Sequence, residues 1–205
     1  FVAKERPKTM DQLLAKAALA SLPEINLGNP GDSASATVHR TFMPNSSPAA
    51  IAVSLPGGHS YCFDAGTCRL RYVWRGGFIK KNGSFGRWRT LPTIEGQVYH
   101  QESSFPIRFE SWNEKPPKTD FMGYRMVGGI PEFRYQANGV EITEFLAKLP
   151  GMSGLSRRFK IENPPSDLLF KVNPDAGVEI SCGNRKAVNG MFRLSREEAK
   201  DFTVI

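Results

Sequence analysis

The chain has 205 residues, of which 40% are hydrophobic and 23% are charged, and its formal net charge at pH 7 is +7. These values are typical of a globular domain, and no run approaches the roughly 20 apolar residues that a transmembrane helix needs. The 19 glycines and 15 prolines favour many short elements over a few long helices, so we predict one β-rich domain.

The first element in chain order is a predicted short helix over residues 9–22. Apolar residues recur there at helical spacing, Thr9 can cap the helix, and Pro23 ends it. A loop rich in Gly, Asn and Ser follows, and after it the hydrophobic period changes from helical to alternating. We therefore divide the chain into an N-terminal helix and linker, residues 1–36, and a β-domain, residues 37–205.

Short stretches with period-two alternation, separated by turn residues, fill the remainder of the chain. The dipeptide Asn-Gly, which is the strongest short signal for a two-residue hairpin turn, occurs between such stretches at Asn82-Gly83, Asn138-Gly139 and Asn189-Gly190. Residues 196–202 predict a single helical turn before a last strand. The fold class predicted from this pattern is all-β, an antiparallel β-sandwich with a short N-terminal helix.

Two cysteines flank a tight turn at the start of a basic segment. If Cys62 lies opposite Cys68, three residues remain in the hairpin loop, and Gly66 fits the left-handed position that ends such a loop. Opposed residues on antiparallel strands lie within reach of a disulfide, so we predict a Cys62–Cys68 disulfide and an oxidising compartment. Two reduced core thiols are the alternative, and the third cysteine, Cys182, is expected to be buried in a strand.

The whole surplus of positive charge lies between residues 65 and 94, where seven basic residues occur without an acidic one. Alternation after the turn predicts Leu70, Tyr72 and Trp74 on the core face of one strand. Exposed arginines around a tryptophan are typical of a binding surface, and a local positive field favours an acidic partner. The predicted binding residues are Arg71, Arg75, Arg87, Trp88 and Arg89.

No motif in the chain indicates a particular reaction, a phosphate-binding loop, a covalent haem site or a metal site. We therefore assign no catalytic residue and expect no cofactor and no metal. Acid–base chemistry on a carbohydrate stays open as an alternative. It would use a histidine and a carboxylate brought together in a cleft. The candidates are His39, His59 and His100, with Glu102 or Asp120.

Two motifs carry a resemblance to a known group of proteins. The core "YCFDA…CRLRYVWRGGF" at residues 61–78 and the hairpin at residues 131–144 resemble a segment found in large secreted proteins of planctomycete-type bacteria, often beside c-type cytochrome domains. The second half of the chain is also similar to the β-sandwiches of aldose-epimerase-like proteins. The resemblance implies a periplasmic or otherwise extracytoplasmic location and an association with a c-type cytochrome or a carbohydrate-oxidising system.

These observations together predict a non-catalytic extracytoplasmic module that uses its basic aromatic surface to bind an acidic partner. The partner is an acidic glycan or a redox protein that contains a c-type cytochrome. Nucleic acid is not expected, because the chain has the charge for it but no nucleic-acid-binding motif. The alternative function is a carbohydrate-active enzyme of the epimerase-like sandwich type.

Overall fold

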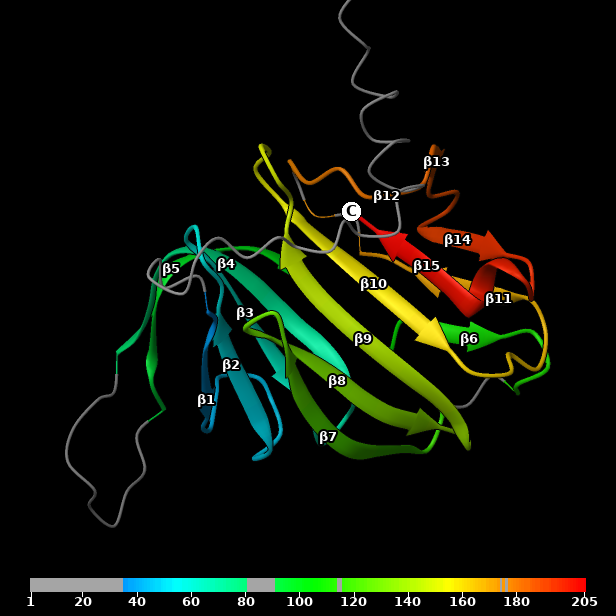
Figure 1. Cartoon of the computed structure of the whole chain (residues 1–205), viewed down its shortest axis with the longest axis horizontal. Helices are drawn as coiled ribbons and strands as arrows, with labels where there is room; N and C mark the ends of the chain where they lie inside the picture. Colours follow the sequence, from blue (N-terminus) through cyan, green and yellow to red (C-terminus); the bar gives the residue numbers. More distant parts are fainter. Residues whose placement is uncertain (1–34, 81–90, 114–115, 174, 176) are drawn as a thin grey trace, which may run out of the picture.

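The computed structural model describes residues 35–80, 91–113, 116–173, 175 and 177–205. In these ranges the chain forms antiparallel sheets, which confirms the predicted all-β sandwich (Figure 1). The helix predicted over residues 9–22 lies outside the described residues. Within the described part, no helix is long and apolar enough to cross a membrane.

The regular elements are short and follow one another closely. In chain order they are β1 (Thr37–Arg40), β2 (Ala50–Ser54), β3 (His59–Asp64), β4 (Arg69–Lys80), β5 (Thr93–Gln101), β6 (Ile107–Phe109), β7 (Thr119–Val127), β8 (Ile130–Ala137), β9 (Val140–Lys148), β10 (Leu155–Ile161), β11 (Leu168–Lys171), β12 (Ser181–Cys182), β13 (Arg185–Lys186), β14 (Met191–Leu194), a 3₁₀ turn (Glu198–Lys200) and β15 (Asp201–Val204).

Three sheets build the sandwich. The first is a five-stranded meander in the order β1-β2-β3-β4-β5. The second has seven strands in the order β13-β12-β15-β10-β9-β8-β7, and the third has three in the order β14-β11-β6. Neighbouring strands joined by short turns account for most of the pairing, as expected for a sheet built from hairpins.

Aromatic side chains fill the space between the sheets. Phe63 of β3 stacks on Phe133 of β8 with ring centroids 4.0 Å apart, which joins the five-stranded sheet to the seven-stranded sheet. Phe170 of β11 packs edge-on against Phe159 of β10 at 5.2 Å, which joins the three-stranded sheet to another part of the seven-stranded one. These rings belong to one continuous buried cluster, so the three sheets share a single core.

The five-stranded sheet is buried on its other face as well. A second apolar cluster holds Cys62, Tyr72 and Trp74 on that face, and Phe78 packs against it. Leu70 belongs instead to the main core, because a β-bulge at Cys62/Phe63 leaves Arg71 without a direct partner and reverses the alternation. The prediction that Leu70, Tyr72 and Trp74 share one face was therefore wrong.

The predicted Cys62–Cys68 disulfide is also wrong, since both residues are free and buried. The hairpin pairs Asp64 with Arg69, so its loop has four residues and Cys68 lies in the loop with φ +49° instead of opposite Cys62. The two sulfurs face different apolar clusters. Burial raises the pKa of Cys62 to about 12 and that of Cys68 to about 11, so both remain protonated thiols.

Local turn signals were more reliable than the cysteine spacing. Asn138 and Gly139 have φ of +48° and +80° and connect β8 to β9 directly, as a two-residue hairpin requires. Asn189 and Gly190 form the same kind of turn before β14. The predicted helical turn near the end is the 3₁₀ turn Glu198–Lys200, whereas Asn82-Gly83 lies outside the described residues.

Candidate functional site

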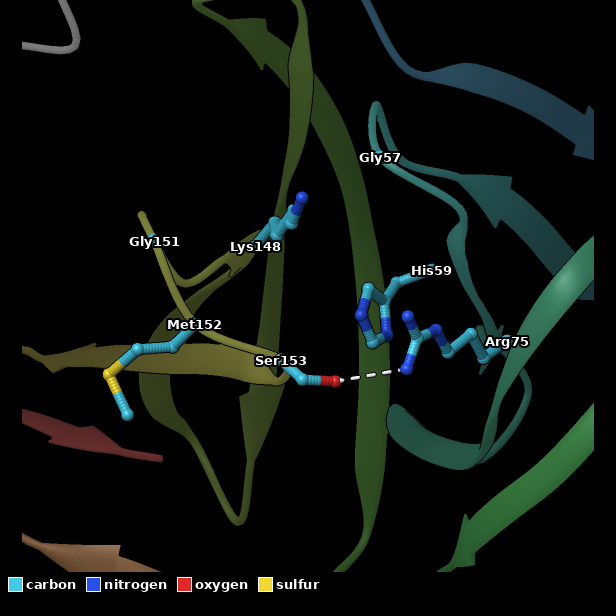
Figure 2. A pocket seen from close by; sticks show the side chains of 7 residues that line it. All are labelled: Gly57, His59, Arg75, Lys148, Gly151, Met152 and Ser153. Carbon is cyan, nitrogen blue, oxygen red and sulfur yellow. Dashed lines mark hydrogen bonds between the residues drawn. The ribbon is translucent and has the colours of Figure 1, made fainter.

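A pocket of about 200 Å³ opens where an end of the five-stranded sheet meets the hairpin between β9 and β10. One side comes from the turn before β3 and from β3 and β4, and the other comes from the end of β9 and the turn after it. Figure 2 shows the side chains that line it. We call this site the cationic pocket; its lining residues are Gly57, His59, Arg75, Lys148, Gly151, Met152 and Ser153.

Sheet pairing brings the first two polar groups together. His59 and Arg75 are direct partners across β3 and β4, so their side chains leave the same face of the sheet. The guanidinium of Arg75 lies beside the imidazole ring and donates a hydrogen bond to Ser153 Oγ at 3.3 Å, as Figure 2 shows. The pocket therefore joins the two sheets through a polar contact.

Lys148 brings a second positive charge to the pocket from the other sheet. A Cβ atom on Gly57 would lie only 2.5 Å from Lys148 Nζ, so the lysine side chain runs directly over this glycine. Gly57 also has φ +88°, a conformation that side-chain-bearing residues rarely adopt. The glycine thus serves both the tight turn and the close approach of the ammonium group.

Among the described residues, no neighbouring carboxylate neutralises the positive charge of the pocket. No acidic residue is among the lining residues. In the described ranges, neither Arg75 nor Lys148 has a carboxylate within 4.0 Å. Both residues are exposed, so an anion can approach them from solvent.

His59 is a neutral hydrogen-bonding group in this field. Its residue is 3% exposed, and burial, followed by the nearby charges of Arg75 and Lys148, lowers its pKa. Its Nδ1 atom lies 3.0 Å from the hydroxyl of Tyr99 on β5. Burial raises the pKa of Tyr99 to about 12, so this hydroxyl keeps its proton and can donate to Nδ1, which leaves the Nε2–H as a donor.

Of the predicted binding residues, Arg75 lies in the pocket and Arg71 does not. Arg71 is half-buried and donates a hydrogen bond to the carbonyl of Asn45, so it holds the loop after β1. Arg87, Trp88 and Arg89 lie outside the described residues. Lys148 and Ser153 were not predicted from the sequence, in which the glycines of the two turns, Gly57-Gly58 and Gly151, were the available signal for this site.

A second group of charges lies inside the sandwich. We call it the Arg157 cluster and define it as Glu102, Tyr135, Glu144 and Arg157. Arg157 Nε donates to Glu144 Oε1 at 2.5 Å, its Nη1 donates to Glu102 Oε1, and Tyr135 Oη donates to Glu144 Oε2 at 2.8 Å. The guanidinium also lies over the ring of Phe159, 4.8 Å from its centroid.

The Arg157 cluster is deeply buried, with 7% of the Arg157 side chain exposed and none of the Glu144 side chain. Burial raises the pKa of Glu144, although the charge and hydrogen bond of Arg157 act in the opposite direction. Two carboxylates share one guanidinium here, so each buried carboxylate has a cationic partner within the cluster. This arrangement indicates that the Arg157 cluster has a structural role, since buried ions need partners of this kind.

His100 connects the Arg157 cluster to the surface. Its Nδ1 atom lies 2.6 Å from Asp175 Oδ2, and its Nε2 atom lies 4.0 Å from Glu102 Oε1. Asp175 also accepts from the backbone N–H of Gln101, and Asn173 donates to the carbonyl of Gln101. The segment after β11 is thereby fastened to the end of β5.

Among the candidate residues for acid–base chemistry that the structure describes, His100 and Glu102 lie together, with Nε2 and Oε1 4.0 Å apart, and the others lie in separate places. His39 stacks on Phe78 at 5.8 Å, His59 lines the pocket, and His100 contacts Asp175. Asp120 is exposed on β7. Within the described part of the chain, no three His, Cys, Asp or Glu residues are placed to hold a metal ion.

Comparisons of the chain with protein-family models, with curated proteins and with solved structures give no significant match. The function therefore has to be argued from the geometry and charge of the two sites above. Of these, the cationic pocket is open, and no carboxylate of the described part of the chain opposes its charge. The Arg157 cluster is closed and largely paired.

Proposed function

We propose that the protein is a non-catalytic module that binds an acidic glycan in the cationic pocket. The observation that carries the proposal is the convergence of Arg75, Lys148 and His59 on a concave site without a carboxylate. Unopposed positive charge at a surface pocket costs little in water and gains energy when an anionic group enters. The positive field and the concave shape of the pocket together support recognition of a charged group on a sugar polymer.

The shape of the site favours a glycan over the acidic face of a protein such as a c-type cytochrome. Protein interfaces are broad, with about 800 Å² buried on each partner, and their energetic centres are usually apolar or aromatic. The cationic pocket is small and polar, and it fits a single charged substituent. A sugar polymer can supply such substituents at regular intervals along its length.

An extracytoplasmic location belongs to the same proposal. Because Cys62 and Cys68 are free thiols, no disulfide between them supports that location. The resemblance to segments of secreted bacterial proteins remains as its support, and acidic polysaccharides are abundant outside the cytoplasm. Fractionation of the native host, followed by detection of the protein in the periplasm or the cytoplasm, tests the location directly.

Binding to charged and neutral forms of one polymer tests the function. Dextran sulfate and carboxymethyl-dextran carry negative charge, whereas dextran does not. We expect the full chain to bind at least one charged polymer at about 20 mM NaCl, to bind it less tightly at about 150 mM, and not to bind dextran. Arg75→Ala should weaken binding by about tenfold, since it removes a charge-assisted hydrogen-bond donor.

The matched control is Lys186→Ala, which removes the same formal charge from β13. Its side chain is 87% exposed and lies outside the cationic pocket. This variant should bind almost as tightly as the unmodified chain. Equal losses in Arg75→Ala and Lys186→Ala would show that net charge, not the pocket, holds the polymer. No binding of either charged polymer by the folded chain would refute the proposed function.

Acid–base chemistry on a sugar is a second candidate, and the contact between His100 and Asp175 is the observation in its favour. A histidine and a carboxylate this close, with Nδ1 2.6 Å from Asp175 Oδ2, are the pair of groups that proton transfer on a sugar would use. Polarimetry of glucose and galactose anomerisation tests it. Acceleration by the protein that is lost in His100→Gln would support this candidate, and no acceleration would remove it for these two sugars.

A further inference from the structure

The donors of the cationic pocket define the kind of anion that it can take. We propose that the pocket binds a tetrahedral ester group, a sulfate or a phosphate monoester, on the glycan in preference to the carboxylate of a uronic acid. This inference rests on the proposed function, because it names the substituent that the same pocket recognises. It follows from the number, direction and charge of the donors.

Four donor groups reach the pocket from different elements. Arg75 comes from β4, His59 from β3, Lys148 from the end of β9, and Ser153 from the turn between β9 and β10. Arg75 uses one N–H on Ser153, which leaves its other N–H groups and the hydroxyl hydrogen of Ser153 available. Figure 2 shows these groups on opposite sides of the space, while Met152 points away from it.

The number of ligand oxygens decides between the two kinds of anion. A carboxylate has two oxygens in one plane, so a fork of N–H groups from one arginine already satisfies it. A sulfate or phosphate ester has three terminal oxygens that point in three directions. Donors arranged on both walls of a pocket match the second geometry, since Arg75, Lys148 and His59 can each face a different oxygen.

Charge gives the same preference for a phosphate ester. Arg75 and Lys148 place two permanent positive charges at the pocket, and no acidic residue lines it. A phosphate monoester carries between one and two negative charges at pH 7, and a sulfate ester carries one that is spread over three oxygens. A carboxylate carries one charge, as a sulfate ester does, so charge favours only the phosphate ester over the carboxylate, and the preference for a sulfate ester depends on its three oxygens.

The test uses one polymer backbone with three substituents: dextran sulfate, phosphorylated dextran and carboxymethyl-dextran of equal charge per sugar. Affinities are measured by calorimetry at about 100 mM NaCl, where weak non-specific attraction is reduced. We expect the sulfated or the phosphorylated polymer to bind at least about tenfold more tightly than the carboxymethylated one, the gain that one additional charge-assisted hydrogen bond provides. The tighter of the two identifies the ester.

The variants show whether the preference belongs to the pocket. In Lys148→Ala the ratio of ester to carboxylate affinity should fall towards one, because the second cation is removed, whereas Lys186→Ala should keep the ratio. Carboxymethyl-dextran binding as tightly as both esters would overturn this inference and leave the proposed function standing. Failure of all three polymers to bind the folded chain would overturn both.

Discussion

Arg75 and Arg157 are two arginines of one sandwich in opposite surroundings. Arg157 lies between the sheets beside the carboxylates of Glu102 and Glu144, and 7% of its side chain is exposed. Arg75 lies at the rim, where it donates to the neutral hydroxyl of Ser153. This fold therefore places carboxylates beside the buried arginine and leaves the exposed arginine unmatched, where water or a ligand can supply the partner.

The two regions also differ in what a removed side chain leaves behind. Without Arg157, the carboxylates of Glu102 and Glu144 would remain in a low-dielectric core with no cation beside them. Without Arg75, no buried partner loses its counter-charge. Stability should therefore depend on the first arginine and binding on the second, and substitutions can separate the two roles.

The largest effect is expected for Arg157→Leu. This change leaves two buried carboxylates unpaired, so the free energy of unfolding should fall by about 3–5 kcal/mol, measured by urea denaturation at pH 7. The control is Arg125→Ala, which breaks an ion pair to Glu132 whose arginine side chain is 77% exposed and should cost at most about 1 kcal/mol. Equal losses would mean that burial does not distinguish the two pairs.

A smaller effect is expected at the turn that supports Lys148. Gly57→Ala and Gly58→Ala both place a side chain at a positive φ, +88° and +80°, so each should lower the free energy of unfolding by about 1–2 kcal/mol. A methyl group at Gly57 also displaces Lys148, whereas one at Gly58 meets nothing within 4 Å.

These paired variants therefore sharpen the distinction between fold and site. Gly57→Ala should weaken binding of a charged dextran, and Gly58→Ala should leave it close to that of the unmodified chain. The measurements are urea denaturation for stability and calorimetry for binding. If both variants bind equally well, the position of Lys148 over Gly57 does not contribute to ligand recognition.

Arg75→Ala should change stability least among the arginine variants. The side chain of Arg75 is exposed and makes no ion pair with a described residue. Its removal should therefore leave the free energy of unfolding within about 0.5 kcal/mol of the unmodified value. The same variant should bind a charged dextran about tenfold less tightly. A large loss of stability would show that Arg75 holds the two sheets together instead of serving a ligand.

The smallest effect is a dependence on pH that comes from His59. Its pKa is lowered in the folded chain, so its contribution to stability is complete above the unfolded value of 6.5 and is lost as the pH falls through the folded value. His59→Asn should therefore flatten part of the decline in urea midpoint below pH 6.5. A bound anion opposes the charges of Arg75 and Lys148, so it should raise the pKa of His59, measurable by NMR titration.

Local sequence signals predicted much of the fold. Period-two alternation gave the strands, and Asn138-Gly139 gave a hairpin, because each depends on residues that are neighbours in the chain. The disulfide failed because one residue more in the loop changes which side chains are opposed. The bulge at Cys62/Phe63 likewise moved Leu70 to the other face, and no local signal in the sequence marks it.

The site was predictable only in part. Arg75 stands in a conspicuous basic segment, and the sequence analysis selected it. Lys148 and Ser153 lie more than 70 residues further along, in a hairpin with no unusual charge. Their meeting with Arg75 depends on how the two sheets pack, which composition and periodicity do not determine. The burial of Glu102 with Arg157 has the same origin.

The contacts of Asn173 and Asp175 with Gln101 have a consequence for how copies of this chain can associate. Asn173 donates to the carbonyl of Gln101, and Asp175 accepts from its N–H. Gln101 lies at the end of β5, the outermost strand of the five-stranded sheet. Those backbone groups are then closed to a strand from a second molecule. At this end of β5, the sheet cannot be extended into a fibre or a swapped dimer without first releasing both side chains.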